Sequence, residues 1–208
     1  MEQVLDVYKR PYSKSHPVVC MDESPKQLIK ETRSSLPMKP GMEKREDYEY
    51  ERCGVCNVFM ANEPLAGKRY IRITEFKTKK DWAVFVKEIA DTYYSNAEKI
   101  TLVMDNYNTH TPGALYEVYP PQEAKRIWDR FEFIYTPKHA SWLNMAEIEL
   151  HVLMSQCLCR RIDNISEIQK EVNAWQNHRN NKNCKIDWRF NTKDARIELK
   201  KLYPSIHV

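Results

Sequence analysis

The chain consists of short apolar runs separated by longer segments in which apolar residues recur at helical spacing. The short runs are rich in β-branched and aromatic residues and are bounded by turn residues, which predicts strands. Apolar residues that recur every three or four positions predict helices with one buried face. The predicted strands cover residues 17–23, 53–60, 70–74, 100–104 and 131–135. The predicted helices cover residues 78–95, 122–130, 142–161, 165–178 and 192–202.

This order of elements predicts an α/β fold in which three strands, a helix and a fourth strand come first. Residues 1–16 are polar and predict a lead-in segment, and residues 24–51 are charged and rich in turn residues, which predicts mainly loop. We therefore expect a core domain over residues 17–162. A helical C-terminal extension over residues 163–208 is expected to pack on that core.

Composition narrows the class of protein. Hydrophobic residues make up 42% of the chain and charged residues 30%, which allows both a sizeable core and a soluble surface. No apolar run approaches the ~18 residues of a membrane span, and the N-terminus lacks a signal-peptide pattern, so a cytoplasmic protein is expected. The net charge of +4 permits a nucleic-acid partner without requiring one.

Two acids follow predicted core strands directly. Asp105 comes directly after the run at 100–104, and Asp22 lies at the end of the run at 17–23. Open α/β sheets carry their chemistry at the carboxyl ends of their strands, so both acids are candidate site residues. Each is also compatible with a simple capped turn.

A third acid lies on the apolar side of the helix predicted over residues 142–161. Glu147 falls about 40° from Leu143 on a helical projection, inside the apolar stripe, whereas Glu149 points elsewhere and is expected to face solvent. A carboxylate on a buried face is costly unless it is paired or binds a cation. Glu147 reaching solvent at the edge of the stripe, or pairing with a Lys or Arg, remains an alternative. The stripe consists of Leu143, Ala146, Leu150, Leu153, Met154 and Cys157.

Three converging carboxylates without a matching basic cluster would repel one another unless a divalent cation lay among them. An all-oxygen donor set favours Mg²⁺ or Mn²⁺ and suits phosphodiester chemistry with two ions. Cys53 and Cys56 have the spacing of zinc ligands, but the second close pair, Cys157 and Cys159, is less suitable. Reduced thiols are therefore favoured over a zinc site.

These residues lie in stretches that together resemble the catalytic core of DDE transposases, in the bacterial insertion-sequence branch of the mariner-type superfamily. The stretches are VVCMDE at 18–23, LVMDNYNTH at 102–110 and YTPKHASWLNMAE at 135–147, with NEPLAG at 62–67 and DWRFNTKDAR at 187–196. The resemblance implies an RNase H-like fold, a mixed five-stranded sheet (β-β-β-α-β-α-β-α) with helices on both faces. It also implies that Asp22, Asp105 and Glu147 form a metal-binding triad that holds two Mg²⁺ or Mn²⁺ ions.

The activity implied by the resemblance is hydrolysis of DNA at transposon ends, followed by attack of the freed 3′-hydroxyl on target DNA. The implied partners are double-stranded DNA, both terminal inverted repeats and target, and a second copy in an active homodimer. The chain would then associate with the nucleoid. Such transposases usually carry N-terminal helix-turn-helix domains, whereas this chain starts at the core. We therefore expect a fragment, a second reading frame of a split gene with the helix-turn-helix partner in a separate frame, or a remnant without sequence-specific DNA binding. The spacing between Asp105 and Glu147 is longer than in the best-known mariner-type members, which makes Glu147 less secure than Asp105.

Further residues are assigned supporting roles. Asn106 and His110 are expected to orient a metal-bound water or contact phosphate, with a capping or surface role for His110 as the alternative. Trp142 and Asn144 are expected to fix the loop that begins the Glu147 helix. The candidate DNA-contacting residues, each also typical of a solvated helix end, are Lys79, Lys80, Lys138, His139, Arg160, Arg161, Arg179 and Lys182.

Other functions remain open at this point. A catalytically silent transposase relic would bind DNA or protein without cutting. Another RNase H-like nuclease would act on RNA–DNA hybrids. A structural zinc protein would use Cys53 and Cys56.

Overall fold

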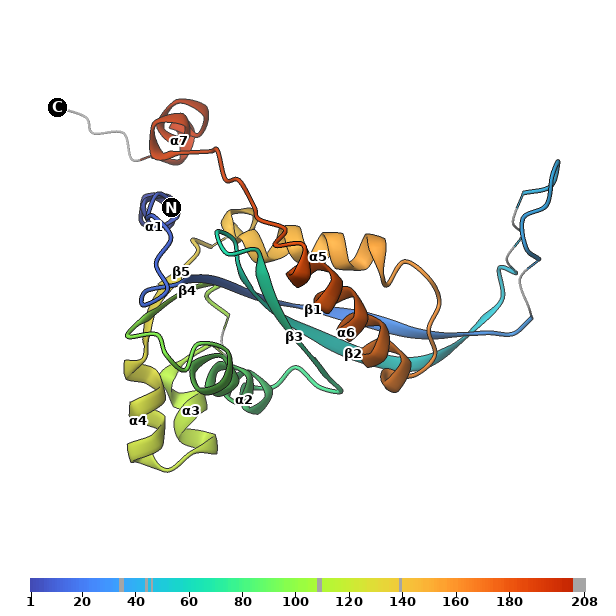
Figure 1. The fold of residues 1–208 in the computed structure, drawn as a ribbon, viewed down its shortest axis with the longest axis horizontal. Coiled ribbons are helices and arrows are strands. Elements are labelled where there is room, and N and C mark those ends of the chain that lie inside the picture. The colour runs from blue at the N-terminus through green and yellow to red at the C-terminus, as the bar shows by residue number, and fades with distance from the viewer. Residues whose placement is uncertain (34–35, 44, 46, 108–109, 139, 204–208) are drawn as a thin grey trace.

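A five-stranded sheet forms the centre of the molecule in a computed structural model that describes residues 1–33, 36–43, 45, 47–107, 110–138 and 140–203. The strands are β1 (Val18–Glu31), β2 (Tyr50–Glu63), β3 (Lys68–Thr74), β4 (Ile100–Met104) and β5 (Phe131–Tyr135). Their order in the sheet is β3-β2-β1-β4-β5 (Figure 1). β2 pairs antiparallel with β1 and β3, whereas β4 pairs in parallel with β1 and β5. The expected mixed five-stranded sheet is confirmed.

The two parallel strands β4 and β5 have the predicted bounds. Every residue of β4 is buried. A parallel strand covered on both faces is apolar along its whole length, which makes it easy to recognise in a sequence.

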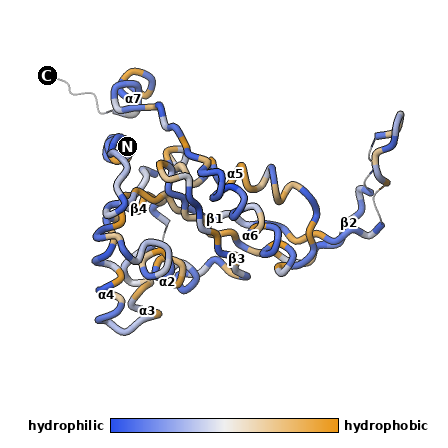
Figure 2. Tube along the Cα trace, in the orientation of Figure 1, coloured by the Kyte–Doolittle hydropathy of each residue, from blue (hydrophilic) through white to orange (hydrophobic). Residues whose placement is uncertain are grey.

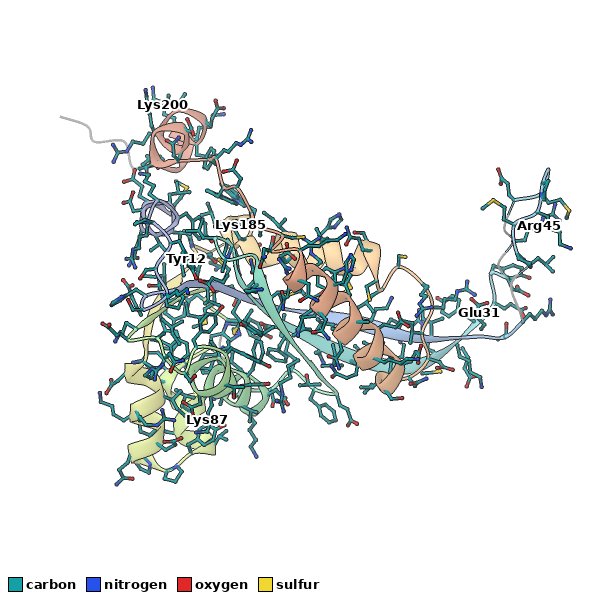
Figure 3. All side chains as sticks on the ribbon, viewed as in Figure 1. Tyr12, Glu31, Arg45, Lys87, Lys185 and Lys200 are labelled. Carbon is teal, nitrogen blue, oxygen red and sulfur yellow. The ribbon has the colours of Figure 1, made fainter. Side chains whose placement is uncertain are left out.

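The first strand is longer than predicted, because β1 continues through Ser24-Pro25 to Glu31. β4 pairs only with residues 18–20 of β1, so beyond Cys20 one edge of β1 has no neighbouring strand and tolerates a proline. Residues 24–31 and 50–51 of the 24–51 segment, predicted mainly as loop, are therefore strand. The outer ends of β1 and β2, paired as far as Glu31 and Tyr50, extend together with the described residues between them as an arm that projects from the sheet. The side chains around Arg45, in this arm, stand clear of the other elements (Figures 1 and 3).

Helices cover both faces of the sheet. α2 (Lys79–Glu88), continued by a π-helical turn (Ile89–Tyr93), α3 (Pro112–Val118) and α4 (Pro121–Asp129) lie on one face. α5 (Met145–Gln156) and α6 (Ile165–Asn181) lie on the other. Each layer buries its own cluster of apolar side chains against the sheet. Figure 2 shows these hydrophobic positions in orange.

Three helix predictions need correction. α3 was not predicted, because seven residues give too little periodic signal, although Pro112 occupies its first turn. The helix predicted over 142–161 begins at Met145, since Ser141–Leu143 form a 3-10 turn and Asn144 caps α5. α5 also ends at Gln156, five residues earlier than predicted.

The N-terminal lead-in segment forms a helix that packs on the core. α1 (Glu2–Tyr8) buries Val4, Leu5 and Val7 against apolar residues of β1, β4 and β5. α7 (Thr192–Glu198), followed by a 3-10 turn (Lys200–Leu202), contacts α1. In the described part of the chain, no helix is both long and apolar enough to span a membrane.

Candidate active site

The parallel pairing of β1 and β4 brings the first two candidate acids to the same place. Val18 pairs with Thr101 and Cys20 with Val103, so the same register places Asp22 beside Asp105. Asp105 follows the end of β4 directly, as predicted, whereas Asp22 was expected at a strand end and lies within β1. Side chains alternate along a strand, so Asp22 lies on the same face as Cys20, the face covered by α5, which carries the third acid.

Asn144 connects the strand of Asp22 to the start of α5. It is fully buried; its Nδ2 donates to the Met21 carbonyl at 2.8 Å and lies 3.5 Å from Asp22 Oδ2. Its Oδ1 accepts a hydrogen bond from the backbone N–H of Ala146 at 3.1 Å, which caps the helix. The same side chain thus fixes the position of α5 and supports Asp22. Trp142 is 43% exposed and packs edge-on against Phe190.

Glu147 faces a shallow cavity shared with Asp22. The cavity, of about 380 Å³, is lined by Asp22, Glu23, Ser24, Glu147, Leu150, His151 and Met154. Glu147 is half-buried, and its carboxylate makes no hydrogen bond or ion pair with any residue that the structure describes. The carboxylate is therefore available to a ligand.

The electrostatics of Asp22 reflect the gathering of acids. Burial raises the pKa of Asp22 to about 7, against a hydrogen bond from the Glu23 backbone N–H that lowers it. The negative charges of Glu23, Asp105 and Glu147 raise the pKa further. The pKa values of Asp105 and Glu23 are instead lowered, because His110 and Lys77 outweigh the burial of these two carboxylates. Asp22 is therefore the acid whose charge a bound cation would stabilise most.

Asp105 is held by a chain of charged side chains on the opposite side from Asp22. His110 Nδ1 lies 2.7 Å from Asp105 Oδ1, and His110 Nε2 lies 3.4 Å from Glu23 Oε2. Lys77 Nζ lies 3.0 Å from Glu23 Oε1. Burial works to lower the pKa of His110, but the hydrogen bonds and charges of Asp105 and Glu23 outweigh it and raise the pKa to about 9. The imidazolium between two carboxylates therefore orients Asp105. Asn106, next to Asp105, is exposed.

Glu23 was not among the residues predicted for the site. Strand alternation directs it to the face opposite Asp22, where it is almost fully buried and paired with His110 and Lys77. The available signal was the adjacent pair Asp22-Glu23 in a strand, because one member of such a pair must be buried on each face of a covered sheet.

The predicted solvent exposure of Glu149 is wrong. It was expected to face solvent, but it is 1% exposed and pairs with Arg69 and Arg179. The reason is that α6 and β3 cover the side of α5 that periodicity alone leaves open.

The predicted DNA-contacting residues differ in availability. Arg179 is occupied by Glu149, and Arg161 donates to the backbone carbonyl of Asp47, so internal contacts hold both guanidinium groups. Lys79 pairs with Glu117, and Arg160 pairs with Glu171. Lys80, Lys138 and Lys182 are exposed. His139 lies outside the described residues.

The donor chemistry of the site fits a hard divalent cation. Three carboxylates, with neither thiol nor imidazole required as ligand, match the preference of Mg²⁺ and Mn²⁺ for oxygen. Within the described ranges, no three His, Cys, Asp or Glu side chains converge closely enough to hold one ion as they stand. The cysteines are unpaired, and Cys20 and Cys56 are buried.

Comparisons with known proteins agree with this architecture. A family model described as DDE superfamily endonuclease matches residues 17–169. No curated protein matches the chain. Similar solved structures include the Mos1 strand transfer complex, at 16% identity and TM-score 0.58, where the match covers 85% of this chain and 51% of that chain.

Two further structures extend the comparison. The Mos1 mariner paired end complex with Mn matches at 15% identity and TM-score 0.57, covering 88% of this chain and 55% of that one. The catalytic domain of Mos1 mariner transposase matches at 14% identity and TM-score 0.51, covering 88% and 87%. The chain thus spans about half the length of the Mos1 chains bound to transposon ends.

The family model covers well over half of the chain, and the matched structures share its fold. The mixed sheet has the RNase H-like fold of the Mos1 transposase catalytic domain, and the chain belongs to the DDE superfamily endonucleases.

Proposed function

We propose that the chain cuts DNA phosphodiester bonds at transposon ends with two divalent cations and joins the freed 3′-hydroxyl to target DNA. The observation that carries this proposal is the register of β1 and β4, which brings Asp22 beside Asp105, with Asp22 in a cavity shared with Glu147. An acid within β1, a second directly after the adjacent strand β4 and a third on the covering helix suit an oxygen-ligated metal site better than they suit structure alone.

Asp22, Asp105 and Glu147 would hold the cations. Bound there, the ions would supply activation of a water or 3′-hydroxyl nucleophile and stabilisation of the leaving oxygen. His110 fixes the carboxylate of Asp105, and Asn144 keeps the backbone around Asp22 and the start of α5 in place. Burial, and after it the neighbouring negative charges, raise the pKa of Asp22, and a cation bound there would offset both.

DNA is expected to approach across the carboxyl ends of β4 and β5. The two strands are parallel and end together, so Lys138, three residues after β5, follows the same sheet edge as Asp105. Lys80, in the first turn of α2, is close in sequence to Lys77, which pairs with Glu23. We therefore favour Lys138 and Lys80 for contacts with phosphate, and Lys182 less strongly.

We also propose that the active form is a dimer. The matched Mos1 structures include paired end complexes. In this chain the projecting arm exposes Leu36, Met38, Met42 and Tyr48. Apolar side chains on a surface arm favour contact with another protein surface.

The reaction class can be tested with linear duplexes taken from the DNA that flanks the coding sequence. With Mg²⁺ or Mn²⁺, the purified chain should nick such a duplex and join its 3′-end to a supercoiled plasmid. EDTA and the Asp22→Asn variant should each abolish both products, because the carboxylates or the cations are then missing. An RNA–DNA hybrid of the same sequence serves as the competing substrate.

Three results would contradict the proposal. Binding of the duplex without nicking, at any divalent cation concentration, would indicate a silent relic. Preferential cutting of the hybrid would indicate a different RNase H-like nuclease. Nicking that persists in EDTA would rule out the cation-dependent chemistry.

A further inference from the structure

A largely buried ion-pair cluster lies on the far side of the helix that carries Glu147. Glu149 Oε2 lies 3.0 Å from Arg69 Nε, and Glu149 Oε1 lies 2.8 Å from Arg179 Nη2. Glu149 and Arg69 are each 1% exposed. These three residues connect α5 with β3 and α6.

The two arginines are themselves firmly anchored. Arg69 Nη2 donates to the Cys184 carbonyl at 2.7 Å, and its backbone N–H donates to Asn180 Oδ1 at 2.9 Å. Asn180 Nδ2 donates back to the Arg69 carbonyl at 2.8 Å. The guanidinium of Arg179 lies over the ring of Trp175. Glu149 is therefore held by groups that cannot follow it if α5 turns.

The geometry of a helix relates this cluster to the candidate site. Residues two positions apart lie about 200° apart around the axis, so Glu147 and Glu149 point in nearly opposite directions. Apolar contacts such as those of Leu150 and Leu153 bury the inner stripe of α5 but are non-directional, so they lack the angular definition of a hydrogen bond. At the roughly 5–6 Å radius of a helix with side chains, a 20° turn moves the end of a side chain by roughly 2 Å. Metal–ligand distances vary by only about 0.2 Å, so such a turn would decide whether Glu147 can reach a cation at Asp22.

Stability alone does not explain the cluster. Burying three charged groups costs solvation, and well-packed apolar side chains of similar size often stabilise a protein as well or better. What the cluster adds is direction, because the hydrogen bond that Arg179 Nη2 donates to Glu149 Oε1 holds only over a narrow range of angles, and Arg69 fixes the charge beside it.

We propose that Glu149 is a positioning residue. Paired with Arg69 and Arg179, it fixes the rotation of α5 so that Glu147 faces Asp22, while Asn144 fixes where the helix begins. The inference rests on the proposed function, since it assigns Glu149 a role toward the cations that Glu147 would hold. It also gives α6, through Arg179, a direct part in shaping the site.

The first test compares Mn²⁺ binding, followed by electron paramagnetic resonance, in the wild type and in Glu149→Gln. Loss of a group that orients a metal ligand is expected to weaken Mn²⁺ binding about 10- to 100-fold. Glu149→Asp keeps the charge and should fall between the two. Glu123→Gln is the matched control, because Glu123 also pairs with two cationic side chains but on exposed α4, and it should bind Mn²⁺ like the wild type.

A second variant separates positioning from folding. Glu149→Gln leaves the arginine charges buried and can unfold the protein, whereas Arg69→Met with Glu149→Leu fills the space with apolar groups. The double variant should keep the helical circular dichroism of the wild type and still bind Mn²⁺ about tenfold or more weakly. Its DNA nicking should need correspondingly more Mn²⁺.

The outcomes are distinct. If folded Glu149→Asp and the double variant both bind Mn²⁺ as tightly as the wild type, the cluster has no positioning role and the inference is wrong. If the wild type itself binds no Mn²⁺, or if Glu147→Gln binds it unchanged, the proposed metal site fails instead.

Discussion

At the residue scale, one ion pair ties the N-terminal segment to the sheet. Arg10 Nη1 and Nη2 contact the two oxygens of Glu132 on β5 at 2.6 and 3.1 Å, and Thr101 Oγ1 donates to Glu132 at 2.7 Å. The hydrogen bonds from Arg10, and to a smaller extent the one from Thr101, lower the pKa of Glu132 from 4.5 to about 2. The pair links residues before β1 to both parallel strands at the core.

This pair predicts a pH-dependent contribution to stability. Because the folded-state pKa is lowered, the contribution is fully present above about pH 4.5 and is lost as the pH falls toward 2. Both side chains are about 40% exposed, so solvent screening limits it to roughly 1 kcal/mol or less. Urea unfolding of Glu132→Gln should show a lower free energy of unfolding than the wild type at neutral pH. The difference should shrink in acid; a difference that grows in acid would contradict the assignment.

Asp22 lies within β1 and only Asp105 follows a strand end, but both were predictable as candidates because an apolar run and the acid that closes it are local features. The positions of Glu149 and Glu23 were not predictable, since the burial and pairing of both side chains depend on residues distant in sequence. Arg69 lies on β3 and Arg179 on α6, and no periodicity within α5 reveals that these elements close over Glu149. His110 could be placed near Asp105 by its spacing, but its second contact with Glu23 depends on the pairing of β1 and β4.

At the scale of elements, the turn between β2 and β3 fits closely against the segment after α6. Gly67 has φ +66°, and a Cβ there would lie 2.5 Å from the backbone carbon of Asn183 and 2.6 Å from its oxygen. Neither backbone atom can move without displacing the chain that also receives the hydrogen bond from Arg69. Only glycine satisfies both the left-handed conformation and the close approach.

Gly67→Ala should therefore destabilise the fold more than the same change at a left-handed glycine in open space. Gly41, with φ +78° and no atom within 4 Å of the place where a Cβ would lie, is the matched control. Gly41→Ala should cost about 1–2 kcal/mol at most for the conformation alone. Gly67→Ala should cost roughly a further 1–3 kcal/mol from the clash. Equal thermal shifts in the two variants would show that the turn does not pack as described.

Element boundaries were predictable where both ends carried a local signal. As expected, β4 ends just before Asp105 and β5 ends just before Thr136-Pro137. β1 did not end at Ser24-Pro25, because the effect of a proline depends on whether a neighbouring strand needs its missing N–H, which is a property of the sheet. The early end of α5 likewise depends on contacts with other elements, since Lys26 on β1 donates to the carbonyl of Leu158.

At the scale of the whole molecule, the arm formed by the outer ends of β1 and β2 projects away from the helices that cover the sheet (Figures 1 and 2). Its described residues include large apolar side chains that are exposed to solvent. This arm could not be predicted from the sequence, because two strands that leave a sheet together have the same local pattern as a charged loop.

Replacing Leu36, Met38 and Met42 by serine should reduce dimer formation on DNA without lowering the melting temperature, because all three side chains are more than half exposed. Light scattering of the protein with a terminal duplex measures the assembly directly. Ile197→Ser, which changes a 65% exposed apolar residue on α7, is the control and should assemble normally. Undiminished dimers in the triple variant would exclude the arm as the dimer contact.

The central claim, that Asp105 and its neighbours form a cation-dependent site for cutting DNA, is tested most directly by single-turnover nicking of a terminal duplex in Mg²⁺. Asp105→Asn should slow nicking by at least about 10³-fold, because it removes an anionic ligand whose cations are worth several kcal/mol in the transition state. Asp129→Asn, in an exposed ion pair on α4, should cut at the wild-type rate. Equal rates for the wild type and Asp105→Asn would contradict the account.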